Sequence, residues 1–176
     1  MKKSKLKQKR YDEMFMKIAQ ISADMSFCER SKVGAVIVKN NRVIVNAWNG
    51  TPSGCDNKCE NEKYVTCPVC NGKDEVYNGI DESTICVNCI NGKVKETITR
   101  EDVIHAEMNA LAYMARTNES AEGATIYVTM SPCLNCAKHL LAAGIKKVIY
   151  LQKYRDTSGI DFLKKYIKVK QLKLKD

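Results

Sequence analysis

The chain has 176 residues, of which 44% are hydrophobic and 28% are charged, a composition typical of one soluble globular domain. No run approaches the roughly 18–20 apolar residues of a membrane-spanning helix, and the basic N-terminus lacks the apolar core of a secretory signal peptide. The formal net charge of +9 is concentrated at the ends, because residues 2–10 and 164–175 hold 12 of the 29 lysines and arginines. We therefore expect a cytoplasmic protein (the host cytoplasm if it is viral) without membrane contact, whose basic ends are solvated rather than bound to nucleic acid.

The predicted elements alternate between helices and strands. Apolar spacing predicts a helix over residues 11–25. Two β-branched runs then predict a hairpin of strands 33–38 and 42–48, followed by a loop at 49–54. After a cysteine-rich segment, the sequence predicts a helix over 105–117, a strand over 124–129, a helix over 133–143, a strand over 146–151, a helix near 160–165 and a final edge strand. This order indicates an α/β fold in which helices cover a mixed sheet.

Residues 55–99 differ from the rest of the chain, because they combine six of the nine cysteines with little hydrophobic periodicity. We interpret them as an insertion. Within it, the pairs "CPVC" and "CVNC" are separated by fifteen residues, and each is followed by an Asn-Gly-Lys sequence, as in an internal duplication. This spacing is typical of zinc knuckles, and four thiolates fill the coordination shell of a structural zinc. The predicted ligands are Cys67, Cys70, Cys86 and Cys89; redox-active thiols are the alternative.

A second constellation joins two short motifs at predicted helix starts. His105 precedes Glu107 by two residues, and Cys133 and Cys136 form a further C-x-x-C pair. Alone, the His-x-Glu motif is equally a helix start with a polar first turn. Together, one imidazole and two thiolates give a zinc ion three ligands and leave the fourth position open for water, which is the catalytic arrangement. H-x-E followed by P-C-x-x-C is the signature of zinc nucleobase deaminases, in which the glutamate moves protons.

The segments "HAEMNAL" (105–111) and "SPCLNCAKHL" (131–140) resemble those of deoxycytidylate (dCMP) deaminases, including bacteriophage ones, within the cytidine deaminase superfamily. The resemblance covers about residues 11–54 and 100–155, and Asn109 favours this branch over transfer-RNA adenosine and riboflavin-pathway deaminases. It implies a three-layer α/β/α fold with a central mixed five-stranded sheet. Residues 1–176 would form one deaminase domain, with residues 55–99 as a small zinc-knuckle insertion within it.

The resemblance also implies the reaction, in which dCMP is hydrolysed to dUMP and ammonia and dUMP supplies thymidylate synthesis. Water activated by zinc would attack C4 of cytosine while Glu107 protonates N3. The residues implied in substrate binding are Asn49, Ala106 and Ser131 near the base and sugar, and Arg30, Tyr154 and Arg155 at the 5′-phosphate. Without the resemblance, some of these residues have an ordinary structural explanation. Asn49 could simply form an Asn-Gly turn, and each arginine could simply be a surface residue.

Several points stay open at the level of sequence. Members of the family are often regulated by dCTP and dTTP through a Gly-Tyr-Asn-Gly segment, in which this chain has Ala47 and Trp48 instead of Gly and Tyr. The resemblance also implies a homo-oligomer, from dimer to hexamer. Phage relatives can hold another zinc through cysteines and histidines, but residues 60–104 contain no histidine. We therefore expect Cys28, Cys55 and Cys59 to be free buried cysteines. The alternative is that they bind a further zinc ion together with another ligand. Alternative functions are deamination of transfer RNA or single-stranded DNA, and a catalytically dead binding module.

Overall fold

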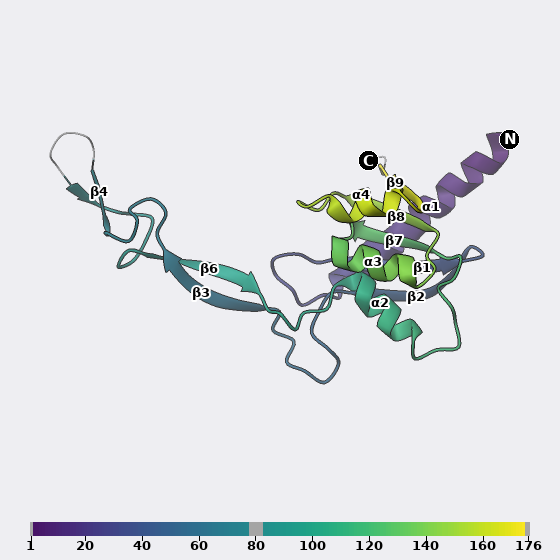
Figure 1. Cartoon of the computed structure of the whole chain (residues 1–176), viewed down its shortest axis with the longest axis horizontal. Coiled ribbons are helices and arrows are strands. Elements are labelled where there is room, and N and C mark those ends of the chain that lie inside the picture. The colour runs from purple at the N-terminus through teal and green to yellow at the C-terminus, as the bar shows by residue number, and fades with distance from the viewer. Residues whose placement is uncertain (1, 78–82, 175–176) are drawn as a thin grey trace.

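The computed structural model describes residues 2–77 and 83–174 and shows a body with a long arm (Figure 1). The body contains a five-stranded sheet in the order β2-β1-β7-β8-β9. The first three strands of that order pair antiparallel and the last three pair parallel, so the sheet is mixed. The strands are β1 (Gly34–Lys39), β2 (Arg42–Trp48), β7 (Thr125–Met130), β8 (Lys147–Gln152) and β9 (Lys168–Gln171). The predicted mixed five-stranded sheet is confirmed.

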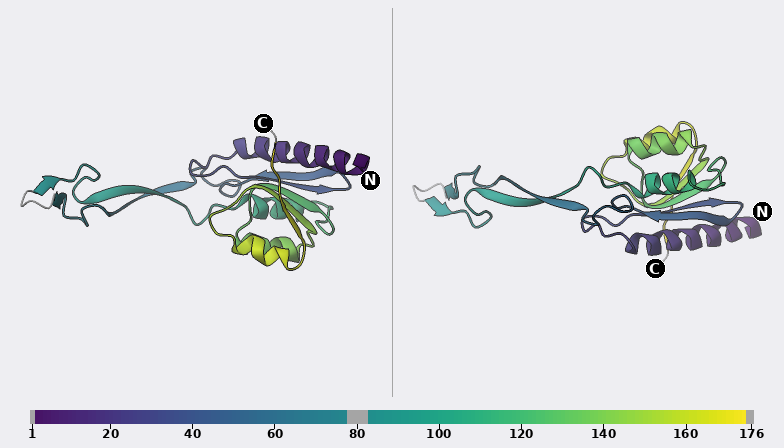
Figure 2. Two further views of the ribbon diagram at one scale, coloured as in Figure 1. Left: turned by 90° about the horizontal axis from the view of Figure 1, so that it is seen from above. Right: turned by 90° about the horizontal axis from the view of Figure 1, so that it is seen from below.

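Helices cover both faces of this sheet. One face packs against α1 (Lys2–Asp24), and the other packs against α2 (Ala106–Met114), α3 (Leu134–Ala142) and α4 (Ser158–Lys164) (Figure 2). Alternation along β1 explains the two layers, because Val36 packs toward Phe15 of α1 while Ile37 packs toward Ala110 of α2. Strands buried on both faces read as continuous apolar runs, as "GAVIVK" does. The three-layer α/β/α prediction is therefore confirmed.

Several predicted boundaries move, most of all at the two ends of the chain, while α2 ends at Met114 rather than at residue 117. The first helix begins at Lys2 rather than near residue 11, because lysine and arginine are good helix formers and the basic segment continues the helix instead of remaining a tail. The final strand spans only Lys168–Gln171, since the sheet edge pairs with β8 over those residues alone. Within the described residues, no helix combines the length and apolar character needed to cross a membrane.

The insertion forms an arm, which we define as residues 60–99, that projects from the body (Figures 1 and 2). Its stalk is an antiparallel ribbon of β3 (Glu60–Thr66) and β6 (Lys93–Thr99), and its tip carries the short hairpin β4 (Glu75–Tyr77) and β5 (Ser83–Ile85). The sequence did not predict these strands. Both faces of the ribbon are exposed, so its sequence lacks the apolar alternation by which a half-buried strand is recognised.

A disulfide joins the body to the start of the arm. Cys28, just after α1, is bonded to Cys59, just before β3, and both are buried. Cys55 is a free and exposed thiol. The expectation of three free buried cysteines is therefore wrong, because the chain brings Cys28 and Cys59 together where the arm leaves the body. Among the described residues these three cysteines form no group of metal ligands.

Candidate active site

Three candidate metal ligands meet where two helices begin. His105 immediately precedes α2, Cys133 is the N-cap residue of α3, and Cys136 lies in its first turn. His105 Nδ1 lies 3.7 Å from Cys133 Sγ and 3.5 Å from Cys136 Sγ. A tetrahedral zinc with ordinary Zn–N and Zn–S bonds separates such atoms by about 3.5 Å. The three side chains therefore fit a zinc ion.

The local electrostatics favour a thiolate. Hydrogen bonds from the Cys136 thiol and from His105 lower the pKa of Cys133 to about 3, and the backbone N–H of Cys136 donates to the same sulfur at 3.5 Å. The first turn of a helix stabilises negative charge in the same way. The hydrogen bond to Cys133 in turn raises the pKa of His105. These contacts favour the thiolate form of Cys133, which is the form that binds metal.

Glu107 lies beside the ligands in the first turn of α2. Its side chain is almost fully buried, and burial raises the pKa of the carboxyl group to about 7. A carboxyl group with a pKa near neutrality can both accept and donate a proton at physiological pH. Glu107 also lines the adjoining cavity, so the proton it carries faces the space in which a ligand would lie.

That cavity has a volume of about 600 Å³. Pockets that enclose small molecules usually measure about 300–1,000 Å³. The cavity wall at the start of α3 is packed tightly against α4, because a side chain at Gly159 of α4 would overlap the backbone of Pro132 and Cys133. The sequence-predicted residues that line the cavity are Arg30, Asn49, His105, Ala106, Glu107, Ser131, Cys133, Tyr154 and Arg155.

The residues predicted near the base have backbone partners. Asn49 accepts a hydrogen bond from the backbone N–H of Val33 and donates one to the carbonyl of Ser31, both at 2.8 Å. Ser131 accepts a hydrogen bond from the backbone N–H of Tyr154 at 2.8 Å. These side chains therefore brace the loops around the cavity, and direct contact with a nucleotide stays a prediction for both of them.

The cationic side of the cavity gathers residues from two distant segments. Arg30 follows α1, whereas Tyr154 and Arg155 follow β8, and the Arg155 guanidinium lies 5.7 Å from the centre of the Tyr154 ring. Lys153 lines the cavity too, although the sequence analysis did not select it. Its position directly after a parallel strand was an available signal, because ligands bind at the carboxyl ends of such strands.

The base of the arm completes the cavity wall, which the sequence analysis missed. Thr99 Oγ1 accepts a hydrogen bond from the Arg30 guanidinium at 3.3 Å. Glu60 is buried, and one of its carboxylate oxygens accepts the backbone N–H groups of Glu29 and Arg30 at 3.1 and 3.3 Å. Both residues line the cavity. The arm therefore holds the backbone and the side chain of Arg30.

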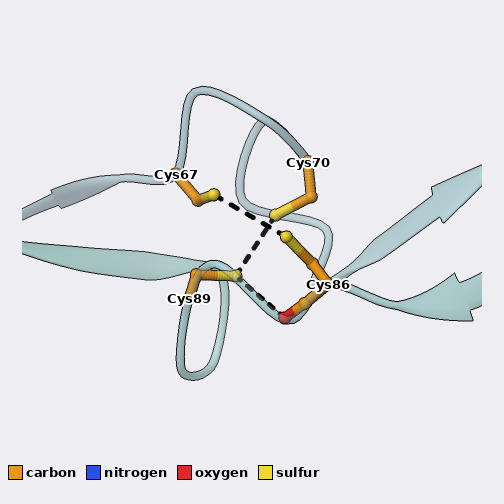
Figure 3. Close-up of side chains that lie close together, drawn as sticks. All are labelled: Cys67, Cys70, Cys86 and Cys89. Carbon is orange, nitrogen blue, oxygen red and sulfur yellow. Dashed lines mark hydrogen bonds between the residues drawn. The ribbon is translucent and has the colours of Figure 1, made fainter.

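A second group of candidate metal ligands lies in the tip of the arm (Figure 3). The sulfurs of Cys67 and Cys86 are 3.9 Å apart, and those of Cys70 and Cys89 are 3.5 Å apart. Two thiolates on a tetrahedral zinc lie about 3.8 Å apart. Hydrogen bonding with the backbone of Cys70 lowers the pKa of Cys67 to about 7. The four cysteines therefore fit a closed zinc site.

The predicted duplication is visible in the backbone of this tip. Asn71-Gly72 and Asn91-Gly92 both lie in the left-handed region, with φ values of 51° and 82° in the first pair and 51° and 69° in the second. The two turns also touch, since a side chain at Gly92 would overlap the backbone of Gly72. Asn-Gly is the dipeptide that adopts this conformation at least cost.

Comparisons with known proteins agree with this geometry. The family described as "Cytidine and deoxycytidylate deaminase zinc-binding region" matches residues 9–152. Deoxycytidylate deaminase of Enterobacteria phage T2 is 36% identical over 148 residues, covering 79% of this chain and 78% of that protein. Deoxycytidylate deaminase of Mycobacterium phage D29 is 39% identical over 142 residues, covering 80% of this chain and 93% of that protein.

Solved structures include a similar protein with nucleotides bound. The dCMP deaminase from the cyanophage S-TIM5, in complex with dCMP and dUMP, superposes with a TM-score of 0.65. It is 35% identical in sequence, and the alignment covers 91% of this chain and 95% of that one.

Proposed function

This chain belongs to the cytidine and deoxycytidylate deaminase family, and we propose that it hydrolyses dCMP to dUMP and ammonia. The observation that carries the proposal is the meeting of His105, Cys133 and Cys136 beside the buried Glu107, on the wall of a cavity of about 600 Å³. Zinc bound by the three ligands supplies a Lewis acid that lowers the pKa of water.

Glu107 moves the protons of the reaction. As a carboxylate it accepts a proton from the attacking water, and as an acid it donates that proton to N3 of the cytosine ring. The water oxygen forms a bond to C4, and the proton that remains on it passes through Glu107 to the departing amino group. The C4–N bond then breaks and ammonia leaves, so that one water is consumed for each dUMP formed. The pKa of about 7 at Glu107 suits both directions of transfer.

The cavity suggests how the nucleotide is oriented. We place the pyrimidine against Ala106 and Ser131, because these residues lie within two positions of the metal ligands in the chain, and we place the base and sugar near Asn49, which lines the same cavity. We place the 5′-phosphate at the cationic end formed by Arg30 and by residues 153–155. A guanidinium suits this role because it is planar and permanently charged.

We assign the cysteines of the tip to a structural zinc, which gives two zinc ions per chain. The closed set of four thiolates leaves no position for water or substrate. The tip contains a small buried cluster of Cys67, Cys70 and Cys86, so metal binding supplies much of its folding free energy. We further propose that residues 1–176 form one deaminase domain that acts in the cytoplasm, with residues 55–99 as a zinc-binding insertion within it.

One experiment separates this function from its alternatives. Zinc-loaded protein is incubated with dCMP, CMP, deoxycytidine and a cytosine-containing oligonucleotide, and released ammonia is followed. We expect dCMP to be deaminated most efficiently. Faster deamination of the oligonucleotide would establish a nucleic-acid editing enzyme instead, and no ammonia from any substrate would mean a binding module. Repeating the dCMP assay with dCTP and with dTTP tests the regulation that the family resemblance implies.

A further inference from the structure

The stalk of the arm lacks the partners that a two-stranded ribbon needs. Of its 14 residues, only Glu60, Val65 and Val94 are not exposed. Tyr64 and Ile98 leave 63% and 39% of their surfaces in water. Ribbons of two strands are marginally stable unless another strand or a helix covers a face. The arm therefore has the character of an element that packs against something outside this chain.

The tip exposes more apolar surface than the stalk. Val87 and Ile90, next to the second cysteine pair, are 92% and 81% exposed. In the β4–β5 hairpin, Glu75 pairs with Ile85 and Tyr77 pairs with Ser83, so that Tyr77 and Ile85 share one face. They are 72% and 78% exposed. Four apolar side chains that are each more than 70% exposed in so small a segment favour an interaction site.

The net charge of the arm indicates which class of partner it can bind. Residues 60–99 contain seven acidic and four basic residues, whereas the rest of the chain contains 13 acidic and 25 basic ones. The arm thus carries a net charge of −3, and the rest of the chain carries +12. A nucleic acid or an anionic membrane would be repelled by the arm. A second copy of this chain offers a surface of the opposite charge.

The matching surface lies on α1. Met14 and Ile21 of α1 are 44% and 68% exposed, and their seven-residue spacing places them on one side of the helix. Met25, which directly follows the helix, is 58% exposed. Arg10 and Lys17, also exposed, each lie one turn before Met14 and Ile21. This stripe is apolar and carries positive charge beside Met14 and Ile21, with one exposed acid, Asp24, at its C-terminal end, whereas the tip is apolar and acidic. Figure 2 shows the arm pointing away from α1 of its own chain, so the tip cannot reach that helix.

We propose that the arm of one copy docks its tip on the exposed stripe of α1 of a second copy. In a pair of chains the contact is made twice, since a two-fold axis places each arm on the other body. The apolar contacts supply affinity, and the opposite charges of arm and body favour this orientation over other encounters.

Sedimentation of the zinc-loaded protein tests this inference with three single variants. Ile85→Asp alters the tip, Ile21→Asp alters α1, and Tyr113→Asp on α2, where the tyrosine is 56% exposed, is the matched control. We expect wild type and control to associate alike, and the first two variants to weaken association by about tenfold or more. Val87→Asp provides a second tip variant, and circular dichroism and zinc content establish that each protein is folded.

A mixture gives the decisive result. Copies carrying Ile85→Asp keep an intact α1, and copies carrying Ile21→Asp keep an intact tip, so mixing them restores one of the two contacts and with it part of the association. Failure of the mixture to associate would overturn the pairing of tip and α1. A monomeric wild type, association unchanged by both tip variants, or association that appears only with a single-stranded oligonucleotide would overturn docking on a second copy.

Discussion

At the scale of single residues, the proposed chemistry rests on side chains at the starts of two helices. His105 and Glu107 flank the start of α2, while Cys133 and Cys136 occupy the start of α3. A short separation along a helix fixes the relative positions of each pair, and the helix ends favour the thiolate. Glu107 differs from the other three because it is not part of the group of candidate metal ligands, and the role proposed for it is to carry protons.

Replacing Glu107 by Gln should leave the fold and the zinc content intact and reduce turnover of dCMP by at least about 100-fold. The amide has nearly the same shape as the carboxyl group but cannot accept or donate the proton, and general acid–base groups contribute about 100-fold or more. Ammonia release and zinc content, measured on the same preparation, check this result. Residual turnover above about one per cent of wild type would remove Glu107 from the proton transfer.

Replacing Arg30 or Arg155 by Ala should reduce kcat/KM for dCMP by the equivalent of about 1.5–3 kcal/mol, the range of a hydrogen bond to a charged group. Activity on deoxycytidine should hardly change, because the nucleoside has no phosphate. The measurement is kcat/KM for both substrates with each variant. Arg42→Ala is the control, since that arginine is exposed on β2 and does not line the cavity. Equal losses on nucleotide and nucleoside would show that the arginine has a structural role.

At the scale of elements, a buried carboxylate ties α1 to the sheet. Asp12 of α1 accepts a hydrogen bond from the Tyr127 hydroxyl of β7 at 2.8 Å and from Lys170 of β9 at 3.3 Å, with Lys147 of β8 at 4.0 Å. Burial alone would raise the pKa of Asp12, but hydrogen bonds from Gln8 and Tyr127 and the two lysines together lower it. One side chain thus joins the helix to three strands.

The pKa of Asp12 is lower in the folded chain than in the unfolded chain, where it is about 3.9. The ionised Asp12 carboxylate therefore contributes fully to stability at pH values above the unfolded pKa. This contribution is lost as the pH falls through the folded pKa. Asp12→Asn should reduce the free energy of unfolding at pH 7 by about 1.5–3 kcal/mol, and the difference from wild type should shrink below about pH 4. Urea unfolding from pH 7 to pH 3 measures both effects.

The control for this prediction lies on the same helix. Asp24 is exposed at the last residue of α1, so Asp24→Asn should change the free energy of unfolding by no more than about 0.5 kcal/mol at any of these pH values. A difference between wild type and Asp12→Asn that stays constant down to pH 3 would mean that the charge of Asp12 is not what stabilises the fold.

At the scale of the whole molecule, the body and the arm hold separate metal-ligand groups. His105, Cys133 and Cys136 belong to the body, and the four cysteines of the tip belong to the arm, at the far end of a two-stranded stalk. The arm nevertheless affects the body, because Glu60 and Thr99 at its base hold Arg30 beside the cavity. The two groups of candidate metal ligands are thus divided between the body and the arm, while residues of both parts line the cavity.

Elemental analysis should find two zinc ions per chain, of which His105→Ala loses one and Cys67→Ser loses the other. Each variant should keep the zinc of the unaltered site, because no residue contributes to both groups. Cys55→Ser, which removes an exposed free thiol, should keep both ions. A single zinc in the wild type would contradict the assignment of the tip, and loss of both ions in Cys67→Ser would show that the two sites fold as one unit.

The sequence by itself was enough to predict His105, Cys133 and Cys136 as metal ligands and Glu107 as the proton carrier, because the spacing within each motif is short and both motifs lie at helix starts that local pattern predicts. It predicted the four cysteines of the tip as ligands from their C-x-x-C spacing alone. It also determined the mixed sheet between helices, since strands buried on both faces have a distinct apolar pattern. Tertiary structure decided the Cys28–Cys59 bond, the ribbon of the arm, and the presence of Glu60, Thr99 and Lys153 at the cavity. These features depend on contacts between segments that are distant in sequence. The strands of the arm could not be predicted because an exposed ribbon buries too little apolar surface to leave an alternating apolar pattern in its sequence.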